Sequence, residues 1–270
     1  MPSIDLNSDL GEGFGPYRIA DDDAILDVVS SANIACGAHA GDPVVMDTTV
    51  REAMKRSVLV GAHIGYTDRE GFGRRAMALS LKELELLTIT QLGALSAIAN
   101  HAGTSLSHAN FHGALGSLSF VDRDVARALI GAIKAFDPKL KFVGLPHTEA
   151  TKAAEAIGIT VVRSFLADRA YTSQGILVSR SQPGSVVKDH RAVAERVRRM
   201  LTEGIVEAID GTIVPMPAES ILIHSDTAGA VTLAKSIHEA VLEAGFVVEP
   251  FPHLAVVHKP SPMKKVQSFL

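Results

Sequence analysis

The chain has 270 residues, and 47% of them are hydrophobic, which is enough to form a large core in one domain, although the length also permits two. The net charge of −4, the absence of Trp and the low aromatic content of 5% argue against nucleic-acid binding, which needs a basic surface and rings for base stacking. The single cysteine, Cys36, excludes an internal disulfide framework and favours a reducing compartment.

The sequence shows neither a targeting signal nor a membrane segment. It begins MPSIDLNSDLGEG, with acids where a signal peptide has a basic region followed by an apolar stretch. No run of about 18 uncharged apolar residues occurs, as a transmembrane helix would require. We therefore expect a cytoplasmic protein without a membrane partner.

Short β-rich runs alternate with longer segments of helical period. The alternation predicts parallel strands joined by crossover helices, and a closed (β/α) barrel of seven strands suits the number of units better than an open doubly wound sheet. We expect residues 1–270 to form one barrel domain, with an excursion at 168–188 that carries a short hairpin. The predicted strands are 4–6, 32–35, 59–62, 107–111, 141–144, 160–165, 221–223 and 247–249. The predicted helices are 21–30, 43–57, 80–102, 122–136, 148–157, 189–204 and 227–244.

Polar side chains follow most of the predicted strands. In a (β/α) barrel the carboxyl ends of the strands meet on one face, where catalytic groups gather. Five histidines on different units fall at such ends, and imidazole is suited to proton transfer or metal binding near neutral pH. Any one of them is more often a structural residue, but the repetition predicts a functional barrel mouth. The side chains at these ends are Asn7, Asp9, Glu12, Cys36, His39, Asp42, His63, Asp68, His112, His147, Asp168, Arg169, His224 and Asp226.

Glycine-rich segments occupy the same loops, at 9–15, 35–42, 71–75 and 224–230. Glycine lets the backbone approach a ligand and can point free N–H groups at an anion, although an ordinary turn is an equally good interpretation. None of these segments has the spacing G-x-x-x-x-G-K-[ST], so the chain has no P-loop and must hold any nucleotide differently.

These segments, in this order, resemble the LamB/YcsF family, whose characterised role is that of the A subunit of bacterial 5-oxoprolinase. The resemblance implies a seven-stranded β/α barrel similar to those of glycoside hydrolases and polysaccharide deacetylases. It also implies ATP-dependent opening of 5-oxoproline to glutamate, with ATP and possible Mg as cofactors and with subunits B and C as partners. The matching stretches are DLNSDLGEGFG (5–15), ANIACGAHAGDP (32–43), GAHIGYTDREGFGRR (61–75), HGAL (112–115), ADRAY (167–171), SRSQPG (179–184) and HSDTAGAV (224–231).

The chain departs from the family pattern at several positions. Asn110 and Phe111 replace a lysine and a proline, and Ser164 replaces a glutamate. Gln174 replaces the acid of a DG pair, and Ser225 and Ala228 stand where Gly and Pro are usual. The loss of a Lys and a Glu removes two charges that could bind phosphate or move protons. These departures leave the family assignment intact but weaken 5-oxoproline as the substrate.

A lactam is a poor electrophile, so its hydrolysis needs a base for water, a stabilised oxyanion and an acid for the leaving nitrogen. We predict Asp9 or His63 as the base, with His39 and His112 as acid or oxyanion partners. Guanidinium groups bind carboxylate and phosphate bidentately, so Arg74, Arg75 and Arg169 are the predicted anion binders. The remaining predicted binding residues are Asn7, Glu12, Asp168, His224 and Asp226.

Two other functions remain open. Asp9, His39 and His63 can form the ligand shell of a divalent metal such as zinc, which would make the protein a metal-dependent amide hydrolase or deacetylase. Alternatively, the replacements at 110 and 164 suit a non-catalytic regulatory subunit that binds a ligand without turnover. The sequence is also compatible with a homo-oligomer.

Overall fold

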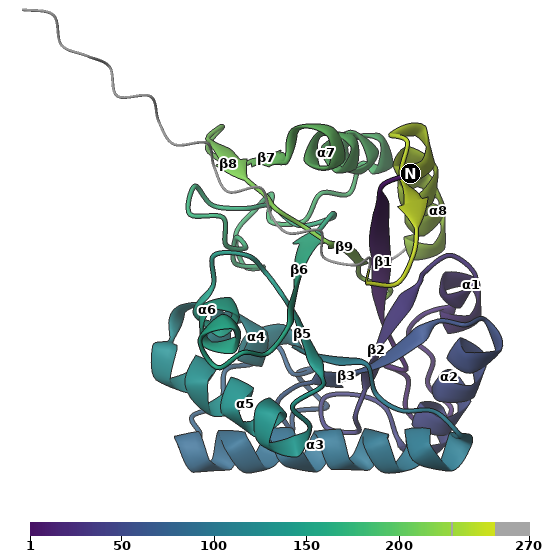
Figure 1. The fold of residues 1–270 in the computed structure, drawn as a ribbon, viewed down its shortest axis with the longest axis vertical. Coiled ribbons are helices and arrows are strands. Elements are labelled where there is room, and N and C mark those ends of the chain that lie inside the picture. The colour runs from purple at the N-terminus through teal and green to yellow at the C-terminus, as the bar shows by residue number, and fades with distance from the viewer. Residues whose placement is uncertain (228, 252–270) are drawn as a thin grey trace, which may run out of the picture.

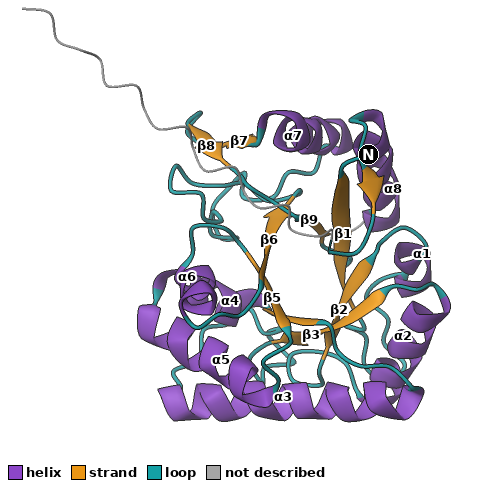
Figure 2. Ribbon diagram, in the orientation of Figure 1, coloured by secondary structure: helices purple, strands orange, loops and turns teal. Residues whose placement is uncertain are grey.

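The computed structural model describes residues 1–227 and 229–251, and a closed barrel of parallel strands forms its centre. The strands follow one another in the order β1-β2-β3-β4-β5-β6-β9, and β9 pairs with β1 to close the ring. Figure 2 shows this ring of strands with the helices outside it. The predicted seven-stranded (β/α) barrel is therefore confirmed. Its strands are β1 (Ser3–Leu10), β2 (Ser31–Ala35), β3 (Leu59–Ile64), β4 (His108–Phe111), β5 (Lys141–Gly144), β6 (Val161–Leu166) and β9 (Ser220–Ile223).

Strand β1 is longer than the segment 4–6 that the sequence predicted. Its side chains alternate between apolar and polar. Leu6 and Leu10 pack into the hydrophobic core, and the intervening Asp5, Asn7 and Asp9 form hydrogen bonds with side chains of neighbouring strands. This period of two is that of a β-strand, but the polar residues line the inside of the barrel. Asn7 and Asp9 consequently lie within the strand and not after it.

The helices surround the barrel (Figure 1). Helix α3 has the predicted capping box at Ser80, and α3 and α7 end at the left-handed glycines Gly103 and Gly204. Helix α1 is much shorter than predicted, and α4 was not predicted, because its apolar sequence GALGSLSFV lacks a clear helical period. The bounds are α1 (Asp22–Leu26), α2 (Pro43–Lys55), α3 (Leu81–Ala102), α4 (Gly113–Val121), α5 (Arg123–Phe136), α6 (Glu149–Ala156), α7 (His190–Glu203) and α8 (Ala230–Glu243).

The remaining strands lie outside the ring. Strands β7 (Ile205–Glu207) and β8 (Ile213–Pro215) form an antiparallel hairpin that the sequence did not predict. Strand β10 (Val247–Val248) pairs with the first residues of β1. The excursion at 168–188 folds back on itself through isolated bridges, Arg169 with Val186 and Tyr171 with Leu177. It therefore returns to the end of β6 from which it starts.

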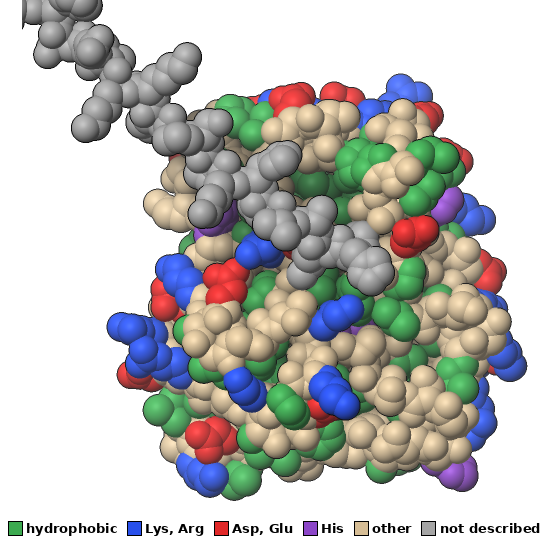
Figure 3. All heavy atoms as spheres, viewed as in Figure 1, with side chains coloured by type: hydrophobic (Ala, Val, Ile, Leu, Met, Phe, Trp, Pro, Cys, Tyr) green, Lys and Arg blue, Asp and Glu red, His purple; other side chains and the backbone are tan. Residues whose placement is uncertain are grey.

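The surface shows charges of both signs. On the face in Figure 3, Lys and Arg are interspersed with Asp and Glu and do not gather into one basic patch. None of the helices in the described part of the chain is long and apolar enough to cross a membrane.

Candidate active site

The carboxyl ends of the barrel strands surround a cavity of about 700 Å³. Strands β1, β3 and β9 bring Asp9, His63 and His224 to its wall, although these residues are far apart in the sequence. Asn110 and His112 reach it from β4 and from the loop that follows. The barrel thus draws together polar residues that the sequence placed at separate strand ends.

Next to this cavity, one carboxylate and three imidazoles form a buried cluster of Glu12, His39, His63 and His112. One donor atom from each residue lies within 4.8 Å of every other. Glu12 Oε1 is 3.1 Å from His39 Nε2, 3.8 Å from His63 Nε2 and 3.6 Å from His112 Nδ1. His63 Nε2 is 2.8 Å from His112 Nδ1, and the rings of His39 and His112 are stacked with centroids 3.9 Å apart. The cluster therefore brings together the three predicted histidines His39, His63 and His112.

The protein fixes the tautomers of two of these rings. His63 Nδ1 donates to Asn110 Oδ1 at 2.7 Å, which leaves a lone pair on Nε2. His112 Nε2 donates to the carbonyl oxygen of Phe72 at 2.8 Å, which leaves a lone pair on Nδ1. Both lone pairs therefore point into the cluster. His39 differs, because its buried Nδ1 has no hydrogen-bond partner among the described residues.

Burial sets the charge of the cluster. Loss of solvent lowers the pKa of His39 and of His112 well below their ordinary values, and the neighbouring imidazoles lower both further. Burial also lowers the pKa of His63. For Glu12, burial and then the charge of Asp9 raise the pKa well above the usual range. The cluster thus favours neutral imidazoles, which accept protons or bind a metal ion.

The donor set fits a divalent metal ion. Four donors at about 2.1 Å from a tetrahedral ion lie about 3.4 Å from one another, and the four distances measured here, from 2.8 to 3.8 Å, fall on either side of that value. Histidine ligands usually donate their second N–H to an oxygen, as His63 and His112 do here. The sequence predicted a metal shell of Asp9, His39 and His63, and the cluster differs from it in two ways. Glu12 joins the two histidines in place of Asp9, and His112 is added.

Asp9 lies beside the cluster on the cavity side. Its Oδ2 is 3.4 Å from His63 Nε2, and its Oδ1 accepts a hydrogen bond from Asn33 Nδ2 at 2.8 Å. Asn33 in turn contacts Asn7, which lies deeper in the barrel and donates to Ser31. Asn7 was predicted to bind substrate, but it does not line the cavity and instead supports the residues above it.

A second acid–base pair lies at the ends of β6 and β9. His224 Nδ1 is 3.0 and 3.1 Å from the two carboxylate oxygens of Asp168. Burial alone would lower the pKa of His224, but the charge and hydrogen bond of Asp168 raise it above its ordinary value. His224 therefore favours the imidazolium form, in contrast to the three histidines of the cluster.

The predicted anion-binding arginines have different surroundings. Arg74 lines the cavity and forms an ion pair with Asp226 at 2.6 Å. Arg75 is paired with Asp68 and does not line the cavity, so the geometry gives its predicted role no support. Arg169 lines the cavity but donates to the carbonyl oxygens of Ser185 and Val178, which ties the ends of the excursion together.

Three N–H groups of the glycine-rich loops already have partners within the chain. The N–H of Gly11 donates to Asp22, that of Gly15 to Asp42 and that of Gly71 to Asp68. At these three positions the structure favours the ordinary turn over the anion site, the two interpretations that the sequence left open. Gly73 instead serves close packing, since a Cβ there would lie 2.7 Å from His39 Cβ.

Residues that the sequence analysis missed also line or support the site. Asn33 holds Asp9, and its only sequence signal is a polar residue inside a buried strand. Arg180 lines the cavity from the excursion and had no assigned role, although it stands in the SRSQPG motif. Cys36 is buried, and burial raises the pKa of its thiol to about 12, which agrees with a packing role.

Three departures from the family pattern also lie at the cavity, namely Asn110, Phe111 and Ser164. Asn110 fixes the His63 ring, and Ser164 lines the wall with a buried hydroxyl that has no partner among the described residues. Gln174 is exposed, and Ala228 lies outside the described residues.

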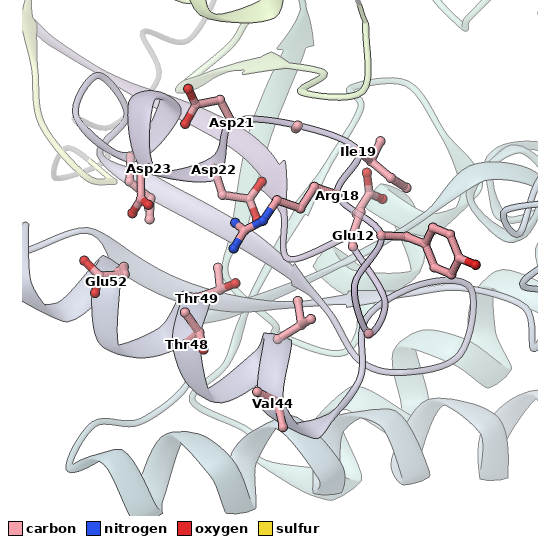
Figure 4. Close-up of a pocket in the computed structure, with 16 residues that line it drawn as sticks. Glu12, Arg18, Ile19, Asp21, Asp22, Asp23, Val44, Thr48, Thr49 and Glu52 are labelled. Carbon is pink, nitrogen blue, oxygen red and sulfur yellow. The ribbon is translucent and has the colours of Figure 1, made fainter.

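A smaller cavity of about 360 Å³ lies between the loop after β1 and helix α2. In Figure 4 the Arg18 side chain extends into it toward Asp22 and Thr49. Burial raises the pKa of Asp22 to about 6, although the carboxylate accepts the Gly11 N–H. Glu12 lines this cavity and also belongs to the histidine cluster, so the two regions meet at that residue.

Comparisons with known proteins show which family the chain resembles in sequence and in fold. The model of the LamB/YcsF family matches residues 4–256. The chain is 49% identical to a 5-oxoprolinase A subunit of Ralstonia nicotianae, over 92% of this chain and 95% of that protein. A lactam utilization protein from Thermus thermophilus has a similar structure, with a TM-score of 0.87 and 43% identity over 92% of this chain and 100% of that one. A protein from Enterococcus faecalis V583, at 11% identity and a TM-score of 0.54, covers 93% of this chain and 97% of its own and resembles it in fold alone.

Proposed function

The chain belongs to the LamB/YcsF family, and on this basis we propose that it is the A subunit of a 5-oxoprolinase, hydrolysing 5-oxoproline or a related small lactam to the open amino acid. The names of the relatives support the reaction class, since they are called a 5-oxoprolinase A subunit and a lactam utilization protein. The observation that carries the proposal is a single cavity lined by His63 and His112, whose pKa values burial lowers, and by His224, whose pKa Asp168 raises.

The two sets of histidines suit the two proton transfers of lactam opening. Asp9 and His63 lie 3.4 Å apart on the cavity wall, and burial keeps His63 in its neutral form, so that this pair can accept the proton of an attacking water. His224 lies on the same wall, and Asp168 stabilises its protonated form, which can donate a proton to the leaving nitrogen. When the surroundings lower the pKa of one group and raise that of another, the first is suited to act as the base and the second as the acid.

We propose that the ATP-dependent step, with Mg, takes place in a complex with subunits B and C. Transfer of the γ-phosphoryl group of ATP to the amide oxygen would release ADP and make the amide carbon more electrophilic. Water would then add to that carbon, the ring C–N bond would break as the nitrogen takes up a proton, and hydrolysis of the resulting acyl phosphate would release phosphate. The chain itself has no P-loop spacing, and three glycine N–H groups of its loops are occupied by carboxylates. The test is ADP release that depends on 5-oxoproline, measured with and without subunits B and C. Release that is independent of this chain, or unchanged by Asp9→Ala and His63→Ala in folded protein, would refute the proposal.

The histidine cluster favours a second candidate, a metal-dependent amide hydrolase. Glu12, His39, His63 and His112 would hold a divalent ion such as zinc. Such an ion supplies a Lewis acid and lowers the pKa of bound water. In that case Asp9 lies where it can orient the water, and His224 keeps its role as acid. Metal analysis of protein purified without added ions distinguishes the two, because a stoichiometric ion with lactam opening in the absence of ATP supports only this candidate.

The third interpretation, a non-catalytic regulatory subunit, predicts ligand binding without turnover even when subunits B and C are present. The same ADP-release assay decides it.

A further inference from the structure

Three arginines, Arg74, Arg169 and Arg180, line the main cavity, and they differ in what their guanidinium groups contact. Arg180 lies in the excursion at 168–188 and lines the same cavity as Asp9 and His224. Arg74 is paired with Asp226, and Arg169 donates to two carbonyl oxygens. Within residues 1–227 and 229–251, no ion pair or hydrogen bond engages the guanidinium of Arg180. This cation is therefore free to meet a ligand.

The charges of the cavity leave a positive surplus at this end. Asp226 neutralises Arg74, and Asp168 neutralises the imidazolium of His224. Asp9 then remains as a negative group against the two cations Arg169 and Arg180.

The electrostatics of Arg180 agree with this balance. Loss of solvent and then the nearby guanidinium of Arg74 lower its pKa, while Asp226 and Asp168 act in the opposite direction. Two guanidinium groups that repel each other within one cavity are stabilised by an anion placed between them.

We propose that Arg180, together with Arg74, binds the anionic group of the substrate in the main cavity. The inference rests on the proposed function and adds a binding site to it. The ligand chemistry is a set of carboxylate or phosphoryl oxygens, and the source is either the carboxylate of the lactam or a phosphoryl group carried by the activated amide. Backbone N–H groups of the loops around Gly11, Gly15 and Gly71 do not supply this site, because the chain's own carboxylates occupy them.

The arrangement orients a small lactam. An anion held by Arg180 and Arg74 is anchored to the same cavity wall that carries His63 and His224. A ring held by its carboxylate can turn only about that anchor, so its amide stays within the cavity. Holding the amide in this way lowers the entropic part of the activation barrier, because the reacting bond is already oriented toward the catalytic groups.

The test measures binding by titration calorimetry with the purified full-length chain and needs no turnover. The ligands are 5-oxoproline, 2-pyrrolidinone, which is the same lactam without the carboxylate, and inorganic phosphate. The variant is Arg180→Met, which keeps an unbranched stem and removes the guanidinium group with its charge. Arg191→Met is the matched control, because Arg191 is also exposed but lies on α7 and does not line the cavity. Thermal melting of each variant confirms that it is folded.

We expect Arg180→Met to weaken binding of an anion by about 10-fold to 100-fold, as the loss of a charge-assisted hydrogen bond does, and Arg191→Met to leave it unchanged. Weaker binding of 5-oxoproline with unchanged binding of 2-pyrrolidinone identifies the lactam carboxylate. Weaker binding of phosphate alone identifies the phosphoryl group. The proposal is overturned if Arg180→Met and Arg191→Met bind both anions as the unmodified chain does, or if the unmodified chain binds neither at millimolar concentration.

Measurements of turnover distinguish a failure of this inference from a failure of the proposed function. In the complex with subunits B and C, loss of the anion site raises KM for 5-oxoproline more than it lowers kcat. A chain that binds these anions through Arg180 but never opens a lactam refutes the proposed function and leaves the anion site standing.

Discussion

His63 Nε2 and His112 Nδ1 face each other across 2.8 Å, although each ring already donates its other N–H to an oxygen. Two lone pairs at this distance repel unless a proton or a metal ion lies between them. Burial lowers the pKa of both rings, so the proton is disfavoured and a cation is the better partner.

We therefore expect the chain to take up one divalent ion per molecule and to gain stability from it. At a free ion concentration of about 100 times Kd, the gain in the free energy of unfolding is about 2.7 kcal/mol. His112→Ala should abolish both effects, whereas His101→Ala, which removes an exposed histidine at the end of α3, should change neither. Metal analysis and thermal melting with and without a chelator measure this. Equal uptake by the two variants would show that the cluster is not the site.

Asn110 should be needed for activity although it carries no charge. Its Oδ1 accepts the Nδ1–H of His63, so Asn110→Ala leaves that ring free to change tautomer and turn. We expect the rate of lactam opening to fall by about 10-fold to 100-fold, while the fold is retained. Asn100→Ala, at the exposed end of α3, is the matched control. A rate for Asn110→Ala equal to that of the control would mean that His63 does not depend on this contact.

The pair of Asp168 and His224 should set the alkaline limit of activity. An acid loses its proton as pH rises through its pKa, and Asp168 holds the pKa of His224 above the ordinary value of 6.5. Without the carboxylate, burial would lower that pKa, so Asp168→Asn should move the alkaline limb of kcat/KM to lower pH. The stability that His224 contributes has the same sign, because it is complete below 6.5 and is lost as pH rises through the raised pKa. An alkaline limb that does not move in Asp168→Asn would remove His224 from the role of acid.

Gly73 should tolerate alanine poorly. Its φ of +62° favours glycine, and a Cβ there would lie 2.7 Å from His39 Cβ and 3.0 Å from His112 Cδ2. Gly103 has a φ of +96° with nothing within 4 Å, so Gly103→Ala measures the backbone strain alone, about 1–2 kcal/mol. We expect Gly73→Ala to lower the free energy of unfolding by about 1–3 kcal/mol more than this control, since it also overfills a packed site. Chemical denaturation of both variants provides the comparison, and equal losses would mean that the loop shifts without cost.

The sequence determined the barrel and most of its elements, because strand and helix periods, capping signals and terminal glycines are local properties of the chain. Ser80 with Glu83 fixed the start of α3, and Gly103 and Gly204 fixed two helix ends. Residues at the carboxyl ends of the strands meet on one face in any barrel of this kind. The meeting of Asp9, His63 and His112 was therefore also predictable. The unpredicted α4 and the hairpin of β7 and β8 lack such local signals.

Only the tertiary structure decided which groups touch and what charge they carry. The sequence did not show that Glu12, and not Asp9, joins the three histidines, since both acids lie close together in the segment DLNSDLGEGFG (5–15). It did not show that the pKa of His112 is lowered while that of His224 is raised, because burial and the contact with Asp168 cause those shifts. Nor did it show that Arg75 is paired outside the cavity, while Arg180 lines the cavity with no guanidinium partner among the described residues. The spacing of apolar and polar residues is a local property of the chain. The burial of a side chain and the groups that it contacts depend on segments that are distant in sequence and meet only when the barrel closes.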